Sequence, residues 1–129
     1  MTGSVNNSGT IALLGGTGDL GGALARRWAK AGLSVVIGSR SVESAERAAA
    51  LLSTEIGRLV GSGGNVEVAA EAEIVVVTVP FAAQEATLLS VRDVVQGKLV
   101  VDATVPASII GAVISHAGTV LIYQRKPPG

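Results

Sequence analysis

The chain has 129 residues, of which 48% are hydrophobic, and its ten basic and ten acidic side chains leave no net charge. This length is typical of one domain with a substantial core, and the charge balance argues against a nucleic acid or an anionic membrane as a partner. The sequence holds no cysteine, which excludes disulfides, thiolate metal sites and cysteine nucleophiles and is compatible with a cytoplasmic location.

Three segments are expected along the chain. Residues 1–9 are polar, lack the basic and apolar regions of a signal peptide, and are predicted to form a flexible tail. Residues 10–124 are predicted to form the folded domain, and residues 125–129 a second flexible tail. No apolar run approaches the roughly 18 residues of a membrane span, so a soluble protein is expected.

The first half of the domain alternates strand and helix patterns. Residues 11–14 predict a buried strand, and Leu20, Leu24 and Trp28 recur at four-residue steps, which predicts an amphipathic helix closed by Gly32. Residues 34–38 predict a second strand. The next helix is predicted from residue 42 to residue 60 by an apolar stripe of Ala45, Ala48, Ala49, Leu52, Ile56 and Leu59.

The second half continues the alternation after a glycine-rich break at residues 61–64. We expect a brief strand at 65–68, a strong strand at 73–79, a helix from about 82 to 95, a strand at 98–102, a short helix at 108–115 and a strand at 119–123. Strands without polar alternation require a sheet that is covered on both faces. The predicted fold is therefore α/β, a Rossmann-like doubly wound parallel sheet in a single domain, with its ligand at the carboxyl ends of the strands.

The most informative motif is the loop between the first strand and the first helix. Its residues are Gly15, Gly16, Thr17, Gly18, Asp19, Leu20 and Gly21. Gly16, Gly18 and Gly21 match G-x-G-x-x-G, in which the glycines allow a tight turn, the approach of a pyrophosphate and close helix packing, respectively. The phosphates would lie at the helix N-terminus. The alternative is a glycine-rich turn without a ligand.

The end of the second strand indicates which nucleotide binds. An NAD site places an acidic side chain there to bind the ribose hydroxyls, whereas this chain has Ser39 and Arg40. A hydroxyl and a guanidinium suit the 2′-phosphate of NADP. The alternative is that Arg40 is an ordinary surface arginine and Ser39 caps the next helix.

No catalytic residue and no metal site are predicted. His116 is the only histidine, and Tyr123 and Lys126 are three residues apart, whereas the short-chain dehydrogenase pair is separated by four. Asp102 ends a strand at the ligand edge, where it would contact a cofactor or cap a loop. Hydride transfer between two cofactors needs no such group, because the protein only has to hold the two reactive carbons close together in a dry site.

Four segments together resemble a known family: ALLGGTGDLG at 12–21, VIGSR at 36–40, VTVP at 77–80 and VVDATVP at 100–106. Their order and spacing are similar to those of the NADPH-dependent reductases of the deazaflavin coenzyme F420, over residues 10 to 106. The resemblance implies hydride transfer between NADP(H) and F420, with NADP as cofactor, F420 as co-substrate and a homodimer as the assembly.

The same resemblance implies roles for individual residues. Thr17, Ser39 and Arg40 would hold the 2′-phosphate, and the glycine loop would hold the pyrophosphate. The walls near the nicotinamide and its ribose would be formed by Val79, Pro80, Thr104, Val105 and Pro106.

Two alternatives stay open. In the family a helical segment follows the NADP-binding domain and helps to complete the deazaflavin pocket, whereas few residues follow Pro106 here. The chain would then be an NADP-binding module, or a truncated cofactor domain, without catalysis of its own. The second alternative is an atypical short-chain dehydrogenase relative, because Gly15, Gly18 and Gly21 also match G-x-x-G-x-x-G.

Overall fold

The computed structural model describes residues 9–103 and 120–123. In chain order the elements of this part are β1 (Ile11–Leu14), α1 (Asp19–Lys30), β2 (Val35–Ser39), α2 (Val42–Ile56), β3 (Gly61–Gly64), α3 (Asn65–Glu71), β4 (Ile74–Val77), α4 (Phe81–Val91), β5 (Leu99–Asp102) and β6 (Val120–Tyr123). The predicted helix at 108–115 lies outside the described residues. So do both predicted tails, except for Gly9 at the end of the first.

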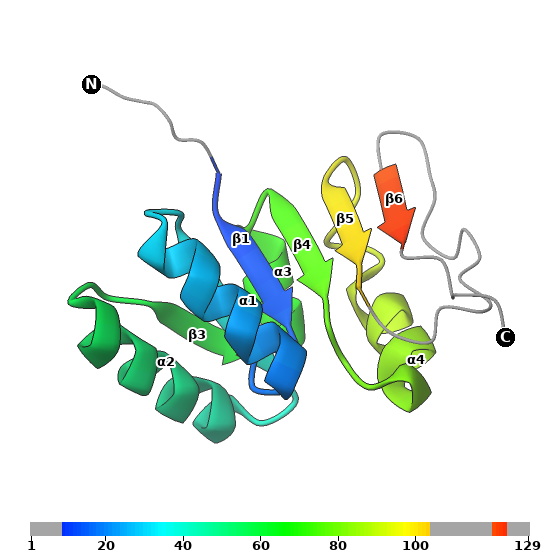
Figure 1. Cartoon of the computed structure of the whole chain (residues 1–129). Helices are drawn as coiled ribbons and strands as arrows, with labels where there is room; N and C mark the ends of the chain where they lie inside the picture. The colour runs from blue at the N-terminus through cyan, green and yellow to red at the C-terminus, as the bar shows by residue number, and fades with distance from the viewer. Residues whose placement is uncertain (1–8, 104–119, 124–129) are drawn as a thin grey trace, which may run out of the picture.

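The strands form one parallel sheet in the order β3-β2-β1-β4-β5-β6 (Figure 1). Leu14 at the end of β1 is aligned with Gly38 of β2 and Val77 of β4, and Val77 is aligned with Asp102 of β5. The chain runs from β1 outward to β2 and β3, and α3 then leads back to β4 on the other side of β1. The carboxyl ends of β1 and β4 therefore flank the switch point at which sheets of this kind bind ligands.

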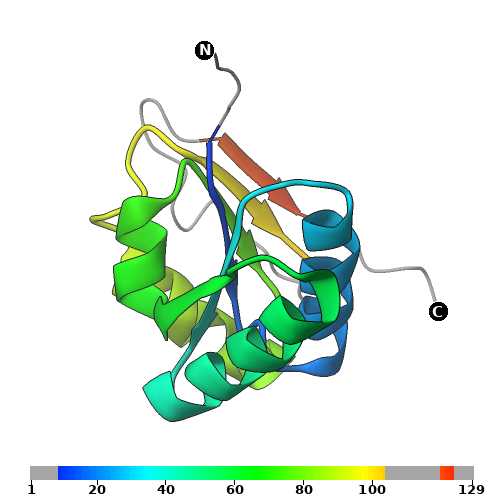
Figure 2. The same ribbon diagram turned by 90° about the vertical axis from the view of Figure 1, so that its left-hand side faces the viewer.

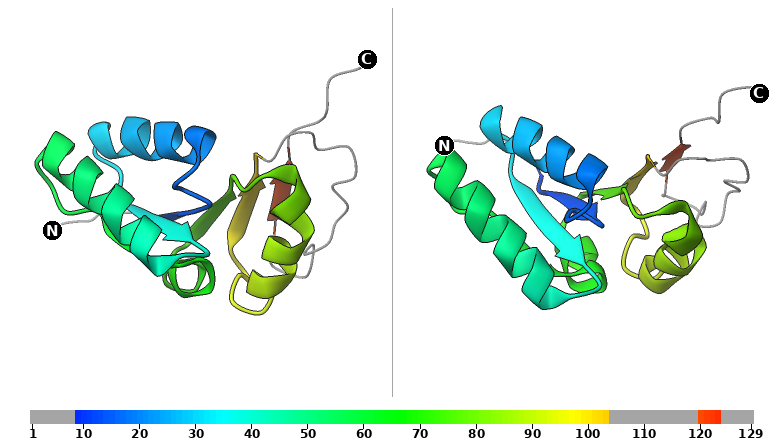
Figure 3. Two further views of the ribbon diagram at one scale, coloured as in Figure 1. Left: turned by 90° about the horizontal axis from the view of Figure 1, so that it is seen from below. Right: turned by 60° about the horizontal axis from the view of Figure 1, so that its bottom comes forward.

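Helices cover both faces of the sheet, as the apolar strands require. Ile11 and Leu13 pack in a core with α1 and α2, whereas Ala12 and Leu14 pack in a second core with α3 and α4. Figures 2 and 3 show these two helix pairs on opposite sides of the strands. This arrangement confirms the predicted doubly wound α/β fold. Among the described helices, none is both long and apolar enough to cross a membrane.

The strand predicted at 65–68 is wrong: these residues begin α3, and the glycine-rich segment before them is β3. Glycine is required in this edge strand because a Cβ on Gly61 would lie 2.5 Å from Val36 Cγ1. The helix starts at Asn65 because the Glu67 carboxylate accepts a hydrogen bond from the Gly64 N–H at 3.0 Å. Such a side-chain contact satisfies an N–H that the first helical turn leaves unpaired.

The predicted apolar stripe of the first helix is confirmed in part, because Leu24 and Trp28 are partly buried and pack against the core. The residues of α1 that are buried against the sheet are Gly21, Ala25 and Ala29, whereas Leu20 is 44% exposed. Small side chains on this face let the helix approach the strands closely.

The second helix is shorter than predicted. It ends at Ile56, where Gly57 adopts the left-handed conformation with φ 75° that helices commonly use to terminate. Leu59, which the stripe assigns to the buried face, is 94% exposed. The remaining described strands and helices start or end within a few residues of their predicted bounds.

Candidate functional site

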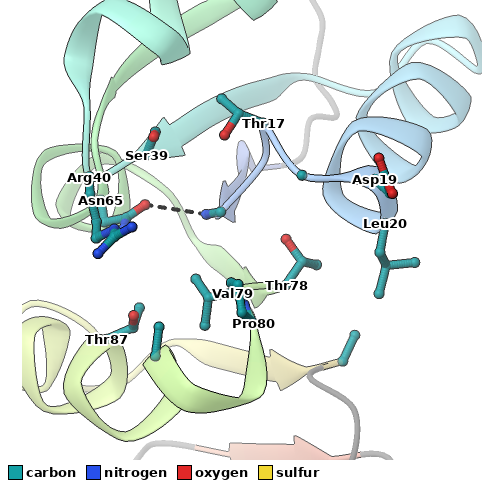
Figure 4. A pocket seen from close by; sticks show the side chains of 14 residues that line it. Thr17, Asp19, Leu20, Ser39, Arg40, Asn65, Thr78, Val79, Pro80 and Thr87 are labelled. Atoms are coloured by element: carbon teal, nitrogen blue, oxygen red, sulfur yellow. Dashed lines mark hydrogen bonds between the residues drawn. The ribbon is translucent and has the colours of Figure 1, made fainter.

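A pocket of about 450 Å³ lies at the carboxyl edge of the sheet, and we call it the edge pocket. Its lining residues are Gly15, Thr17, Gly18, Asp19, Leu20, Ser39, Arg40, Asn65, Thr78, Val79, Pro80, Ala83, Thr87 and Ala103 (Figure 4). The loops after β1, β2, β4 and β5 thus converge as their strand positions predict. Thr104, Val105 and Pro106, which continue the predicted wall, lie outside the described residues.

The glycine loop is held by backbone hydrogen bonds to the neighbouring strand. The N–H groups of Gly15 and Gly16 both donate to the Gly38 carbonyl at 3.0 Å, and the Gly18 N–H donates to the Gly15 carbonyl at 3.1 Å. Gly15 has φ 77°, a left-handed conformation that favours glycine. The residue that makes the tight turn is therefore Gly15, rather than Gly16 as the motif predicts.

The N-terminus of α1 opens toward the edge pocket. Gly18 is its N-cap, and no side chain in the described part of the chain caps it. Asp19 and Leu20 of its first turn line the pocket. The first N–H groups of a helix have no intrahelical acceptor, and the helix dipole makes this end attractive to anions. Backbone donors are thus available where a phosphate would enter.

The two later glycines of the motif have different roles. A Cβ on Gly18 would meet only the Gly15 carbonyl oxygen, at 3.6 Å, so the space beside it is open. A Cβ on Gly21 would lie 2.6 Å from that oxygen and 2.6 Å from Thr78 Oγ1. Gly18 therefore leaves room for a ligand, while Gly21, which does not line the pocket, lets α1 pack against the strand ends.

Ser39 and Arg40 lie at the end of β2 on the edge pocket. The Ser39 Oγ accepts a hydrogen bond from the Ser41 N–H at 3.1 Å, and Ser41, not Ser39, caps α2 by accepting from the Ser44 N–H at 3.2 Å. The alternative in which Ser39 is the helix cap is therefore wrong. The Ser39 hydroxyl keeps its proton as a donor for a ligand.

No carboxylate neutralises Arg40 in the described part of the chain. The two ion pairs found there both involve Glu55, whose carboxylate lies 3.2 Å from Arg26 and 3.0 Å from Lys30 on α1. The hydrogen bond from Lys30 lowers the pKa of Glu55. The guanidinium of Arg40 lies beside Asn65 at the mouth of the pocket (Figure 4). It is thus a free positive charge at the place predicted for the 2′-phosphate.

Asn65 is a pocket residue that the sequence did not single out. Its Oδ1 accepts a hydrogen bond from the Gly15 N–H at 3.4 Å, which ties the start of α3 to the glycine loop. A Cβ on Gly38 would lie 2.9 Å from this oxygen and 2.6 Å from Val68 Cγ2. The glycine before Ser39 therefore allows α3 to approach the loop.

The opposite wall is built by the end of β4 and the start of α4. The Thr78 hydroxyl donates to the Leu14 carbonyl at 2.8 Å, and Val79 and Pro80 follow it on the pocket surface. Asp102, only 1% exposed, accepts a hydrogen bond from the Gln84 side-chain amide behind this wall. Within residues 9–103 and 120–123, no group of three or more His, Cys, Asp or Glu side chains could hold a metal ion.

The doubly wound sheet, the glycine loop at its switch point and the open helix N-terminus define a domain of the Rossmann type. A family model described as NADP oxidoreductase, coenzyme F420-dependent, matches residues 10–106. The chain belongs to this family.

Curated relatives agree with this assignment. The F420-dependent NADP reductase of Methanothermobacter thermautotrophicus is 50% identical over 99 residues, which are 74% of this chain and 43% of the relative. The enzyme of the same name from Methanocaldococcus jannaschii is 37% identical over 108 residues, which are 78% of this chain and 48% of the relative. The chain thus spans less than half the length of these two relatives.

Solved structures share the fold. An imine reductase variant from Myxococcus stipitatus, in complex with NAD⁺, superimposes with a TM-score of 0.72 at 18% identity, over 91% of this chain and 40% of that one. A shikimate dehydrogenase in complex with NADP⁺ gives a TM-score of 0.63 at 18% identity, over 88% of this chain and 42% of that one. At these identities the likeness shows the fold alone.

Proposed function

We propose that the chain binds NADP(H) in the edge pocket and takes part in hydride transfer between NADP(H) and coenzyme F420. One observation carries this proposal. The glycine loop, the open N-terminus of α1 and the unpaired Arg40 all line one pocket, in a chain that belongs to this family. The family's relatives are named F420-dependent NADP reductase.

In this proposal the pyrophosphate binds to the glycine loop and the first turn of α1. Thr17, Ser39 and Arg40 bind the 2′-phosphate, where a hydroxyl donor and a guanidinium form charge-assisted hydrogen bonds. The nicotinamide and its ribose lie against Val79 and Pro80, with Thr104, Val105 and Pro106 as further wall residues.

The chemistry is the transfer of a hydride between nicotinamide C4 and deazaflavin C5, for which the two cofactors supply the electrons. The contribution of the chain is to bind the nucleotide, to orient its reactive face and to exclude water by apolar side chains such as Val79. We assign no side chain a role in bond breaking. We also propose a cytoplasmic location, which the absence of cysteine supports. We further propose a homodimer, which family membership supports.

A first test follows the transfer directly. We expect that adding NADPH and oxidised F420 to the chain lowers the deazaflavin absorbance at a rate proportional to protein concentration, because both redox centres are then present. A chain that binds NADPH tightly but leaves F420 oxidised would contradict the catalytic part of the proposal.

A second candidate is an NADP-binding module without turnover of its own. It is favoured by the match to only 43% of the Methanothermobacter thermautotrophicus reductase. Calorimetric titration distinguishes the two when it is combined with the absorbance assay: the module binds NADPH and never reduces F420, whereas the reductase does both.

A further inference from the structure

Thr87 places a buried hydroxyl in the edge pocket. It lies on α4, one turn after Ala83, and both residues line the pocket. The residue is only 7% exposed. Among residues 9–103 and 120–123, no hydrogen-bond partner for its hydroxyl is found. The Ser90 hydroxyl donates to the Thr87 backbone carbonyl at 2.7 Å.

A hydroxyl in this position normally has a partner. Threonine in a helix commonly donates to the carbonyl three or four residues earlier, and most buried side-chain polar groups are hydrogen-bonded. A buried group without a partner costs free energy unless a ligand supplies one. The isolated hydroxyl therefore points to a ligand contact.

The position of Thr87 indicates which part of the ligand it meets. Figure 4 shows its side chain on α4, facing the space across from Arg40 and Asn65. A second hollow of about 470 Å³ shares Ser39, Arg40 and Asn65 with the edge pocket and reaches Ser90, which lies one turn beyond Thr87. Thr87 thus lies on the side of the edge pocket where Arg40 lies. The first turn of α4, which follows Pro80, lies farther from Arg40.

We propose that the Thr87 hydroxyl hydrogen-bonds the adenosine moiety of NADP(H). The inference rests on the proposed function, because Arg40 then holds the 2′-phosphate and the adenosine to which this phosphate belongs lies on the same side of the pocket. A hydroxyl can both donate and accept, so it matches the mixed donors and acceptors of an adenosine.

The test compares Thr87→Val, which removes the hydroxyl at equal size, with Thr87→Ser, which keeps it. Calorimetry uses two ligands, NADPH and the fragment adenosine 2′,5′-bisphosphate, which has no nicotinamide. Thr87→Val should raise the Kd of both ligands by about five- to tenfold, the usual loss for one hydrogen bond, whereas Thr87→Ser should stay within about twofold. The control is Thr54→Val, the same change at an exposed position of α2.

Thermal unfolding without ligand supplies a second readout. Thr87→Val should unfold at the same temperature as the wild type or higher, because the hydroxyl has no partner to lose among the residues that the structure describes. A lower midpoint would overturn the inference by showing a role in the fold. Unchanged Kd values for both ligands, or a loss for NADPH alone, would also overturn it and leave NADP binding intact. Failure of the wild-type chain to bind either ligand would instead overturn the proposed function.

Discussion

Replacing Arg40 with alanine should raise the Kd for NADPH by about 10- to 100-fold and leave the Kd for NADH almost unchanged. Arg40 lines the edge pocket at the end of β2, and no carboxylate pairs with it in the described part of the chain. A hydrogen bond to a charged group contributes about 1.5–3 kcal/mol, and each 1.4 kcal/mol is tenfold in affinity. NADH has no 2′-phosphate, so it has no such contact to lose. Calorimetric titration with both nucleotides measures the difference.

The matched control is Arg47→Ala, which removes the same charge from an exposed position of α2 outside the edge pocket. It should change neither affinity by more than the small effect expected of a screened surface charge. Equal losses for NADPH and NADH in Arg40→Ala would show that Arg40 does not bind the 2′-phosphate.

Gly21→Ala and Gly18→Val should separate folding from binding. A Cβ on Gly21 would lie 2.6 Å from both the Gly15 carbonyl oxygen and Thr78 Oγ1, so α1 must shift, at a cost of about 1–3 kcal/mol for overpacking. Gly18 has φ −81° and open space beside it. Valine there should keep the fold but obstruct the pyrophosphate, and thereby weaken NADPH and NADH alike by at least about tenfold.

Urea unfolding and calorimetry, applied to both variants, test this separation. Gly22→Ala is the control, because a Cβ there would meet its nearest atom, the Gly16 carbonyl oxygen, at 3.8 Å. It should stabilise α1 by up to about 1 kcal/mol, the difference in helix propensity between the two residues. A Gly21→Ala variant as stable as the wild type would contradict the close packing of α1 at Gly21. A Gly18→Val variant with wild-type affinity for both nucleotides would contradict the binding of the pyrophosphate beside Gly18.

The sequence predicts the sheet and the position of the site because both depend on local patterns. Buried parallel strands are continuous apolar runs, as in Ile11–Leu14 and Ile74–Val77. The loops that follow such strands share one edge, so the meeting of the glycine loop with Ser39 and Arg40 follows from chain order. The family's motifs lie in these same loops, which explains why they are recognisable in the sequence.

The parts that the sequence does not predict depend on packing between distant segments. Gly61–Gly64 has no apolar pattern, yet it pairs with β2, where Gly61 leaves room for the Val36 side chain. Asn65 joins the site only once α3 packs against Gly38. Thr87 is one of many polar residues in the sequence. That its side chain is buried, and that its hydroxyl has no hydrogen-bond partner in the described part of the chain, follows only from its neighbours in three dimensions.

The central claim is that the edge pocket binds NADP(H), with its 2′-phosphate at Ser39 and Arg40. A crystal structure of the chain with NADP⁺ tests it most directly. We expect the pyrophosphate within hydrogen-bond distance of the N–H groups at the start of α1. The 2′-phosphate should lie within the same distance of the Arg40 guanidinium and the Ser39 hydroxyl. A nucleotide bound elsewhere, or a 2′-phosphate turned away from Arg40 into solvent, would contradict it.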